Sequence, residues 1–264
     1  MKKPNSKPLL HIAHANGFPG GSYATLAGLL SADYDVRAYD RFGHGKHAVT
    51  DNWPEVKQEL IEYFESLGRP VIAVGHSFGG GLSLMVAMER PDLIKALIML
   101  DSPMLTQVQR LGLGVIKRLG KIDRFTNGLR ASNRRMHWGS EAEALDYLAS
   151  KRMFQSFDPR CLTDYVRAGT RPAEDGVELV FDRNVEAAIF RTVPHTIKPH
   201  KNFKVPAAVV IGSGSDIMGK ANARLMHKSL GMKVRWINGG HLFPFEKPEE
   251  TAHLIQELLK DMPL

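Results

Sequence analysis

Residues 71–81 have the sequence Val-Ile-Ala-Val-Gly-His-Ser-Phe-Gly-Gly-Gly. The apolar run 71–74 is typical of a strand that is buried on both faces of a sheet. An almost wholly apolar segment with a helical pattern follows at 82–88. The stretch therefore predicts a buried strand, a tight turn that carries Ser77, and a buried helix, an order that favours an α/β fold.

The turn has the pattern Gly-x-Ser-x-Gly, with Ser77 between Gly75 and Gly79. A nucleophilic serine needs a strained turn that lifts its hydroxyl above the strand end, where side chains at the glycine positions would collide with backbone. The helix behind it directs free N–H groups toward a developing anion. We expect Ser77 to be a nucleophile; the alternative is a glycine-rich turn with an incidental serine.

Other segments of the chain have a similar strand pattern. Buried strands are predicted at 9–13, 96–100 and 207–211, and more polar strands, suited to the sheet margins, at 35–40 and 233–238. Amphipathic helical patterns separate these strands. The alternation predicts a mostly parallel, doubly wound sheet of about six strands.

The alternation stops between about residues 103 and 195. Helical patterns there cover 106–125, 140–154 and 158–169, and Ser140 and Glu143 have the spacing of a capping box. A block of helices between two buried strands is most simply an insertion on the sheet. We therefore predict a core formed by 1–102 and 196–264, with a helical cap, or lid, at 103–195.

A serine hydroxyl needs a base and an acid that orients the base. His241 follows the last predicted strand in a glycine-containing loop, and the ordinary pKa of histidine suits proton transfer near neutrality. Asp216 follows the strand 207–211 and completes the order Ser77, Asp216, His241, so we favour it as the acid. Asp101, directly after the strand 96–100, is the alternative.

An oxyanion would need two backbone N–H donors. Phe78, the residue after the nucleophile, is expected to supply one. The loop His14-Ala-Asn-Gly-Phe-Pro-Gly20 is expected to supply the other through Phe18, because Gly17 permits a tight turn and Pro19 stiffens it. Alone, this loop would be an ordinary glycine–proline turn.

With these residues in place, the chain resembles the α/β-hydrolase fold superfamily over nearly its full length. Further similarity lies in Tyr39-Asp-Arg-Phe-Gly-His-Gly45 and in the terminal loop Gly239-Gly-His241. The resemblance implies Ser77 as nucleophile, His241 as base, Asp216 as acid, Phe18 and Phe78 as backbone donors, and residues 103–195 as the cap.

Two features depart from that superfamily. Asn16-Gly17 stands where His-Gly is usual, which implies different hydrogen bonding in the loop. Few residues precede the strand 9–13, so we expect the usual N-terminal antiparallel hairpin to be absent and 35–40 to form an exposed sheet edge. We expect that edge either to pair with a second copy in a homodimer or to be shielded by its charges.

The composition limits the classes of protein to which this chain can belong. Apolar residues make up 43% of the chain and charged residues 24%, as in an ordinary globular protein, and the apolar runs are too short to cross a bilayer. The single cysteine, Cys161, excludes an internal disulfide framework and indicates a reducing compartment, the cytoplasm. We find no phosphate loop, zinc spacing or nucleic-acid module, so we expect no cofactor, no metal and no nucleic-acid partner.

The predicted cap carries an excess of positive charge. Residues 110–135 contain eight Lys or Arg and one acid, Asp123, beside an apolar stripe that includes Leu111, Val115 and Leu119. We expect the stripe to pack on the core with its charges in water. The alternative is a basic amphipathic helix that meets a membrane or an anionic substrate such as an acyl-CoA.

These residues predict a serine hydrolase that cleaves a carboxylic ester or thioester of a small apolar substrate. The apolar pocket is inferred from Phe18, Phe78 and cap residues such as Trp138. Carbon–carbon bond hydrolysis, lyase or perhydrolase chemistry with the same residues is an alternative. A binding module without turnover is a further one.

Overall fold

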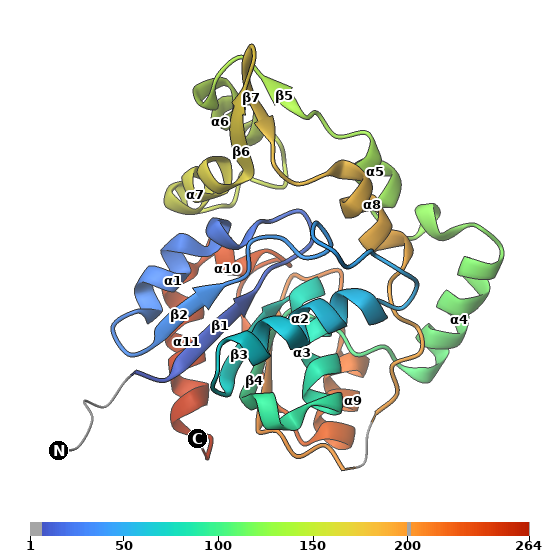
Figure 1. The fold of residues 1–264 in the computed structure, drawn as a ribbon. Coiled ribbons are helices and arrows are strands. Elements are labelled where there is room, and N and C mark those ends of the chain that lie inside the picture. Colours follow the sequence, from blue (N-terminus) through green and yellow to red (C-terminus); the bar gives the residue numbers. More distant parts are fainter. Residues whose placement is uncertain (1–6, 200–201, 264) are drawn as a thin grey trace.

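The computed structural model describes residues 7–199 and 202–263. A six-stranded sheet in the order β2-β1-β3-β4-β8-β9, parallel throughout, forms its centre (Figure 1). The strands are β1 (Leu9–Ala13), β2 (Asp35–Ala38), β3 (Val71–His76), β4 (Ile94–Leu100), β8 (Ala207–Gly212) and β9 (Lys233–Ile237). The predicted parallel sheet is confirmed, and its two polar strands, β2 and β9, lie at the two edges.

Helices cover both faces of the sheet because its strands are apolar on both sides. On one face Leu10 and Ile72 belong to a buried cluster with residues of α1 and α11. On the other, Leu9 and Val71 join a cluster with α2, α3 and α9. These helices are α1 (Ala24–Leu30), α2 (Pro54–Ser66), α3 (Phe78–Glu89), α9 (Lys220–Leu230) and α11 (Pro248–Lys260).

An inserted segment, residues 103–195, lies between β4 and β8. It contains α4 (Gln107–Arg118), α5 (Gly128–Ser132), β5 (His137–Trp138), α6 (Glu141–Ala149), α7 (Pro159–Gly169), β6 (Thr170–Ala173), β7 (Gly176–Leu179) and α8 (Arg183–Arg191). The strands form a small antiparallel sheet in the order β5-β7-β6, which the prediction of a helical cap did not include. A two-residue turn before Gly176 closes the β6–β7 hairpin, and the strands are too short for an apolar pattern to show them.

Aromatic packing joins the inserted segment to the core. Phe18, in the loop after β1, lies with its ring centroid 5.0 Å from that of Tyr165 on α7 and 5.0 Å from that of Phe245. Phe154 and Phe157 of the inserted segment pack on the same ring. Phe245 belongs to α10 (Phe243–Glu246), directly after His241. This cluster places the segment above the carboxyl ends of β1 and β3.

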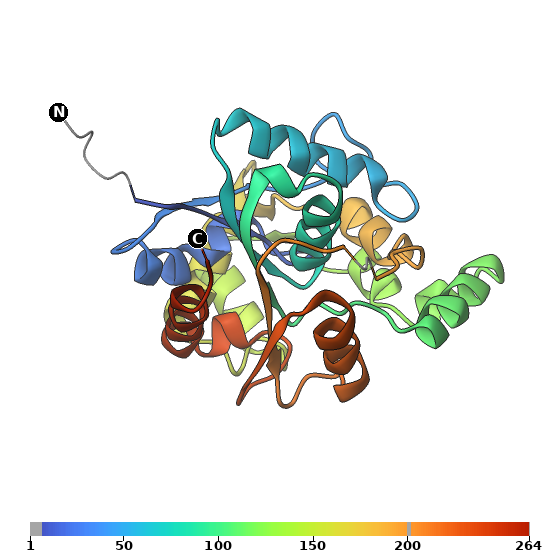
Figure 2. The ribbon, with the colours of Figure 1, turned by 90° about the horizontal axis from the view of Figure 1, so that it is seen from below.

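Helix α4 does not pack as predicted. Leu111, Val115 and Leu119, the expected core-facing stripe, are exposed, and none of the α4 residues is buried. The helix projects from the body of the molecule in both views (Figures 1 and 2). Within the described residues, no helix is both long and apolar enough to span a bilayer.

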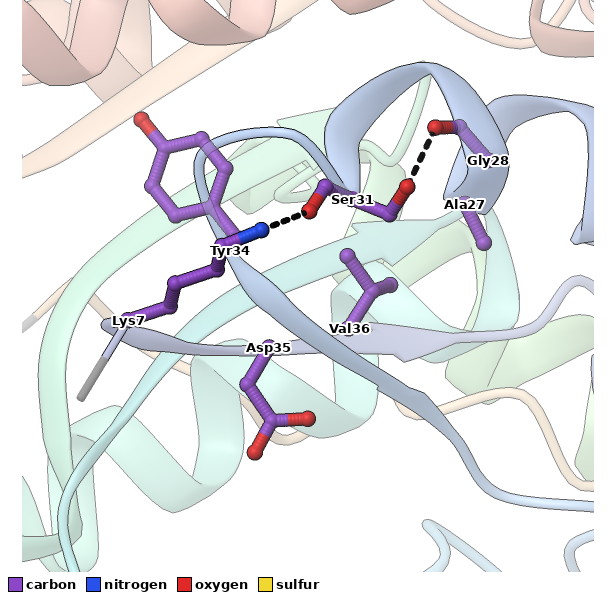
Figure 3. Close-up of a pocket in the computed structure, with 7 residues that line it drawn as sticks. All are labelled: Lys7, Ala27, Gly28, Ser31, Tyr34, Asp35 and Val36. Carbon is purple, nitrogen blue, oxygen red and sulfur yellow. Dashed lines mark hydrogen bonds between the residues drawn. The ribbon is translucent and has the colours of Figure 1, made fainter.

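A surface hollow lies at the other end of the sheet. Lys7, Tyr34 and Asp35 line it together with residues of α1 (Figure 3). Asp35 pairs with Leu9 at the amino ends of β2 and β1. Ser77 follows the carboxyl end of β3, so this hollow and the predicted nucleophile lie at opposite ends of the strands.

Three buried histidines should make the fold sensitive to acid. Burial lowers the pKa of His11 to about 3, of His14 to about 4 and of His76 to about 3. Below pH 6.5 the unfolded chain binds these protons and the folded chain does not, so stability is present above that pH and is lost as pH falls. Three such groups lower the free energy of unfolding by about 4 kcal/mol per pH unit near pH 5. Equilibrium urea unfolding between pH 6.5 and 5 measures this slope.

His11→Leu is the matched variant for this prediction. The His11 ring lies against Tyr63 and Phe64, and neither ring nitrogen has a hydrogen-bond partner among the described residues. The variant should therefore reduce the slope by about a third without removing a hydrogen bond. A slope unchanged in His11→Leu would contradict the account.

Candidate active site

Ser77 occupies the predicted strained turn at the carboxyl end of β3. Its backbone has φ +51° and ψ −115°, a combination that residues with a side chain rarely adopt. Its N–H donates to the Leu100 carbonyl at 2.9 Å, which ties the turn to β4. Glycine is required on both sides, because a Cβ at Gly75 would lie 2.5 Å from Gly80 Cα and one at Gly79 2.1 Å from the Ala13 carbonyl oxygen.

His241 contacts Ser77 as predicted from the sequence. Its Nε2 lies 3.0 Å from Ser77 Oγ. The two residues before it, Gly239 and Gly240, shape the loop, and the Gly240 N–H donates to Glu246 at 3.0 Å. The imidazole is partly exposed, at 22% of its side-chain surface, so it can be reached from solvent.

Asp101 is the carboxylate that contacts His241. Its Oδ2 lies 2.6 Å from His241 Nδ1. It also accepts hydrogen bonds from the Gly212 N–H at 3.0 Å and from the Ser215 hydroxyl at 2.5 Å. The residue is fully buried and has φ +43°, which makes it a second strained position, after Ser77, at the carboxyl ends of the strands. A buried carboxylate that accepts from three donors is held in one position and fixes the orientation of the imidazole.

Asp216, the acid favoured from the sequence, is exposed, and the hydrogen bond and ion pair of His241 Nδ1 are made with Asp101 instead. The reason is topological. Asp101 directly follows β4, the neighbour of β3, whereas Asp216 lies four residues beyond β8, one strand farther from Ser77. The loop after β8 sends Ser215 to the carboxylate of Asp101 instead. The structure thus places the alternative acid, Asp101, beside the histidine.

The two predicted oxyanion donors differ in whether their N–H groups are already used in a hydrogen bond. Phe78 is the first residue of α3, so its N–H takes no part in the hydrogen bonds within the helix. The Phe18 N–H donates to the Ala15 carbonyl at 3.1 Å. Gly17, with φ +80°, fits the third position of a type II turn, whose closing bond uses that N–H. The N–H of Phe18, the second predicted donor, is therefore already engaged within the turn.

A chain of buried hydrogen bonds connects the loop after β1 to the loop that carries His241. The Ala15 N–H donates to the Tyr23 hydroxyl at 3.0 Å, and that oxygen lies 2.7 Å from His76 Nδ1. His76 Nε2 lies 3.0 Å from the His241 carbonyl oxygen. A carbonyl only accepts, so His76 carries its proton on Nε2 and receives one hydrogen bond from Tyr23. Burial, and then the neighbouring His241, lower the His76 pKa to about 3, so the ring stays neutral.

Tyr23→Phe should therefore weaken both the fold and the site. Loss of the hydroxyl leaves the Ala15 N–H and His76 Nδ1 buried without partners, at about 1–3 kcal/mol each. We expect the free energy of unfolding to fall by about 3 kcal/mol and turnover to fall about tenfold through misplacement of His241. Urea unfolding and steady-state kinetics measure the two effects. Tyr34→Phe is the control, because the Tyr34 hydroxyl has no hydrogen-bond partner in the described part of the chain.

The inserted segment also holds the turn after β1 through polar contacts. Arg134 Nη1 lies 2.5 Å from Glu186 Oε2, and its Nη2 donates to the Tyr165 hydroxyl at 2.7 Å. That hydroxyl donates to the Gly17 carbonyl at 3.3 Å, and the Asn16 amide donates to the Glu186 carbonyl at 2.9 Å. Asn16, the departure noted in the sequence, is thus used to join the turn to α8. The sequence carried no signal for this cluster.

The remaining expectations concern ligands and the pocket. Residues 7–199 and 202–263 contain no group of three or more His, Cys, Asp or Glu side chains arranged to hold a metal. His14 and His44 instead bind backbone: His14 Nε2 accepts from the Phe42 N–H, and His44 Nε2 from the Asp182 N–H. Trp138 is buried in β5 against Tyr147, within the small sheet.

Comparisons with known proteins identify the family and the fold of this chain. The sequence profile of the alpha/beta hydrolase family matches residues 9–254. Mouse (Mus musculus) monoglyceride lipase is 29% identical over 111 residues, which cover 38% of this chain and 37% of the lipase. A type I acyl-CoA thioesterase of Penicillium brevicompactum is 28% identical over 190 residues, covering 66% of this chain and 41% of that protein.

The chain thus spans less than half the length of these curated relatives. Among solved structures, E-2-(acetamidomethylene)succinate hydrolase superposes with a TM-score of 0.75. The match is 19% identical and covers 97% of this chain and 92% of that one, which shows a shared fold.

Proposed function

We propose that this chain, which belongs to the alpha/beta hydrolase family, is a serine hydrolase of carboxylic esters or thioesters. The observation that carries the proposal is one continuous hydrogen-bonded series. Ser77 Oγ lies 3.0 Å from His241 Nε2, and His241 Nδ1 lies 2.6 Å from Asp101. A serine, an imidazole and a buried carboxylate in this order are the parts that acyl transfer requires.

The geometry supports the following sequence of steps. Asp101 holds the His241 proton on Nδ1, which leaves Nε2 free to accept the Ser77 proton as Oγ attacks the substrate carbonyl. Collapse of the tetrahedral intermediate breaks the ester or thioester bond, and His241 returns the proton to the departing alcohol or thiol. Water then repeats the cycle, with His241 as base, and releases the acid and free Ser77.

The oxyanion would be held first by the Phe78 N–H at the start of α3. Phe18 is the second donor we propose, with its N–H shared between the Ala15 carbonyl and the oxyanion. Tyr165 and Glu186 bond to Gly17 and Asn16, and Arg134 joins these two side chains. These contacts support a role for the inserted segment as a cap that keeps this turn in place.

The substrate class rests on two kinds of support. Curated relatives at low identity include a monoglyceride lipase and an acyl-CoA thioesterase, both of which cleave acyl bonds. Aromatic side chains also surround the predicted oxyanion turn, with Phe18 stacked on Phe245. We propose an acyl group of modest size and apolar character. The buried, unpaired Cys161 supports the cytoplasm as its location.

The test is covalent labelling combined with turnover. The purified protein should hydrolyse p-nitrophenyl esters or acyl-CoA thioesters, and a fluorophosphonate should label Ser77, as located by peptide mass spectrometry. Ser77→Ala should lose both signals, whereas Ser213→Ala, at an exposed serine near the site, should keep both. Absence of labelling and of turnover in the folded protein would favour a binding module. Labelling without turnover of any ester or thioester would favour carbon–carbon hydrolysis, lyase or perhydrolase chemistry.

A further inference from the structure

Most of the large apolar side chains that the fold leaves in solvent belong to one stretch of the chain. Nine large hydrophobic residues are exposed among those described, and six of them belong to the stretch 108–129. These six, which we call the α4 face, are 56% to 80% exposed: Val108, Leu111, Val115, Leu119, Phe125 and Leu129. A helix of a globular protein normally turns such residues to the core, so this face has a function that intramolecular packing does not supply.

Helix α4 is fixed to the core by its opposite side. Lys117 forms an ion pair with Asp51, and Gln109 accepts a hydrogen bond from the buried Asn222 at 2.8 Å. The backbone at Gly114 lies so close to the His195 ring that a Cβ there would be 3.0 Å from it. The exposed stripe has the spacing 108, 111, 115 and 119, which is one face of a helix. The helix is therefore held with its apolar side outward.

Positive charge flanks the α4 face. Arg118, Lys121, Arg124 and Arg130 are exposed, and none of them has an acidic partner among the described residues. The acid of this stretch, Asp123, is occupied by Arg191 at 2.8 Å. The face thus combines apolar side chains with unpaired cations. A partner that fits it would offer an apolar layer with negative charges beside it.

We propose that the α4 face docks on the surface of an anionic lipid bilayer. The apolar stripe would enter the boundary between headgroups and acyl chains, while the four cations contact lipid phosphates. A neutral apolar partner would leave these cations without counterions. A second copy of this chain would bring the same positive charges together, which opposes pairing through this face. Docking at the interface differs from insertion across the bilayer.

Vesicle sedimentation of the full chain tests the proposal. Binding to vesicles of equal parts phosphatidylcholine and phosphatidylglycerol should exceed binding to pure phosphatidylcholine, and should weaken as salt is added. Leu111→Asp with Val115→Asp should lower the partition coefficient by at least about tenfold. Lys121→Glu with Arg124→Glu should lower it by about a factor of ten or more. Ile217→Asp, at an exposed apolar residue away from the face, is the control.

The readout does not depend on turnover, so Ser77→Ala should bind vesicles as the native chain does. Circular dichroism of each variant separates lost docking from lost folding. Equal binding to neutral and anionic vesicles, or retained binding in folded Leu111→Asp with Val115→Asp, would overturn the proposal. A dimer in light scattering that Leu111→Asp dissociates, without vesicle binding, would assign the face to a second copy instead.

Discussion

Asp101→Asn is expected to lower ester turnover by about ten-thousandfold, as loss of the orienting carboxylate does in serine hydrolases. Asp101 accepts from three donors, which are His241 Nδ1, the Gly212 N–H and the Ser215 hydroxyl. An asparagine presents one acceptor oxygen and an NH₂ group, so at least one donor loses its partner. The imidazole then favours the tautomer protonated on Nε2, which cannot take the Ser77 proton.

Asp216→Asn is the matched control for this prediction. Asp216 is an exposed aspartate, four residues beyond the end of β8, and it has no hydrogen bond with His241. Its turnover should stay within about twofold of the native value. Initial rates of both variants on one p-nitrophenyl ester decide the assignment. The reverse pattern would restore Asp216 as the acid.

Gly79→Ala is expected to destabilise the fold by about 3 kcal/mol or more. The added Cβ would lie 2.1 Å from the Ala13 carbonyl oxygen and 2.7 Å from that of His14, both backbone atoms that cannot turn aside. Strand β1 and helix α3 would have to separate, and the predicted oxyanion turn begins at His14. Turnover of any folded fraction should therefore also fall.

Gly28→Ala provides the comparison, since nothing lies within 4 Å of a Cβ at that position. It lies within α1, where alanine is favoured over glycine by about 0.5–1 kcal/mol. Urea unfolding should show Gly79→Ala strongly destabilised and Gly28→Ala unchanged or slightly stabilised. Similar losses for the two variants would mean that the close contact at Gly79 relaxes at little cost.

The sheet could be predicted from the sequence because most of its strands have an apolar pattern that is visible within a few residues. Runs such as 71–74 and 207–211 are apolar at every position, as expected for strands that are buried on both faces. Ser77 and His241 could also be predicted, from glycine patterns in their own turns. The acid could not, because Asp101 and Asp216 both follow buried strands. Which of them meets His241 depends on strand order, a property of the whole sheet.

The inserted segment shows a second limit of sequence patterns. The spacing of Leu111, Val115 and Leu119 correctly predicts a helix with one apolar side. It does not say where that side points, since an amphipathic pattern is the same whether the stripe meets a core or a lipid surface. The direction is set by contacts distant in sequence, such as Lys117 with Asp51.

The turn after β1 has the same limit. The hydrogen bond from the Phe18 N–H to the Ala15 carbonyl follows from a turn type that Gly17 permits but does not impose.

The position of Asp101 also affects how freely this molecule can change over evolutionary time. With the carboxylate directly after β4, the end of β8 contributes a backbone N–H to the site and the loop after β8 contributes a serine hydroxyl. That loop is not required to deliver an acid. Its outer residues, Asp216 and Ile217, are exposed. Substitution or lengthening there can reshape the rim beside His241 while the proton relay stays intact. The loop is therefore a place where new specificity can arise without loss of activity.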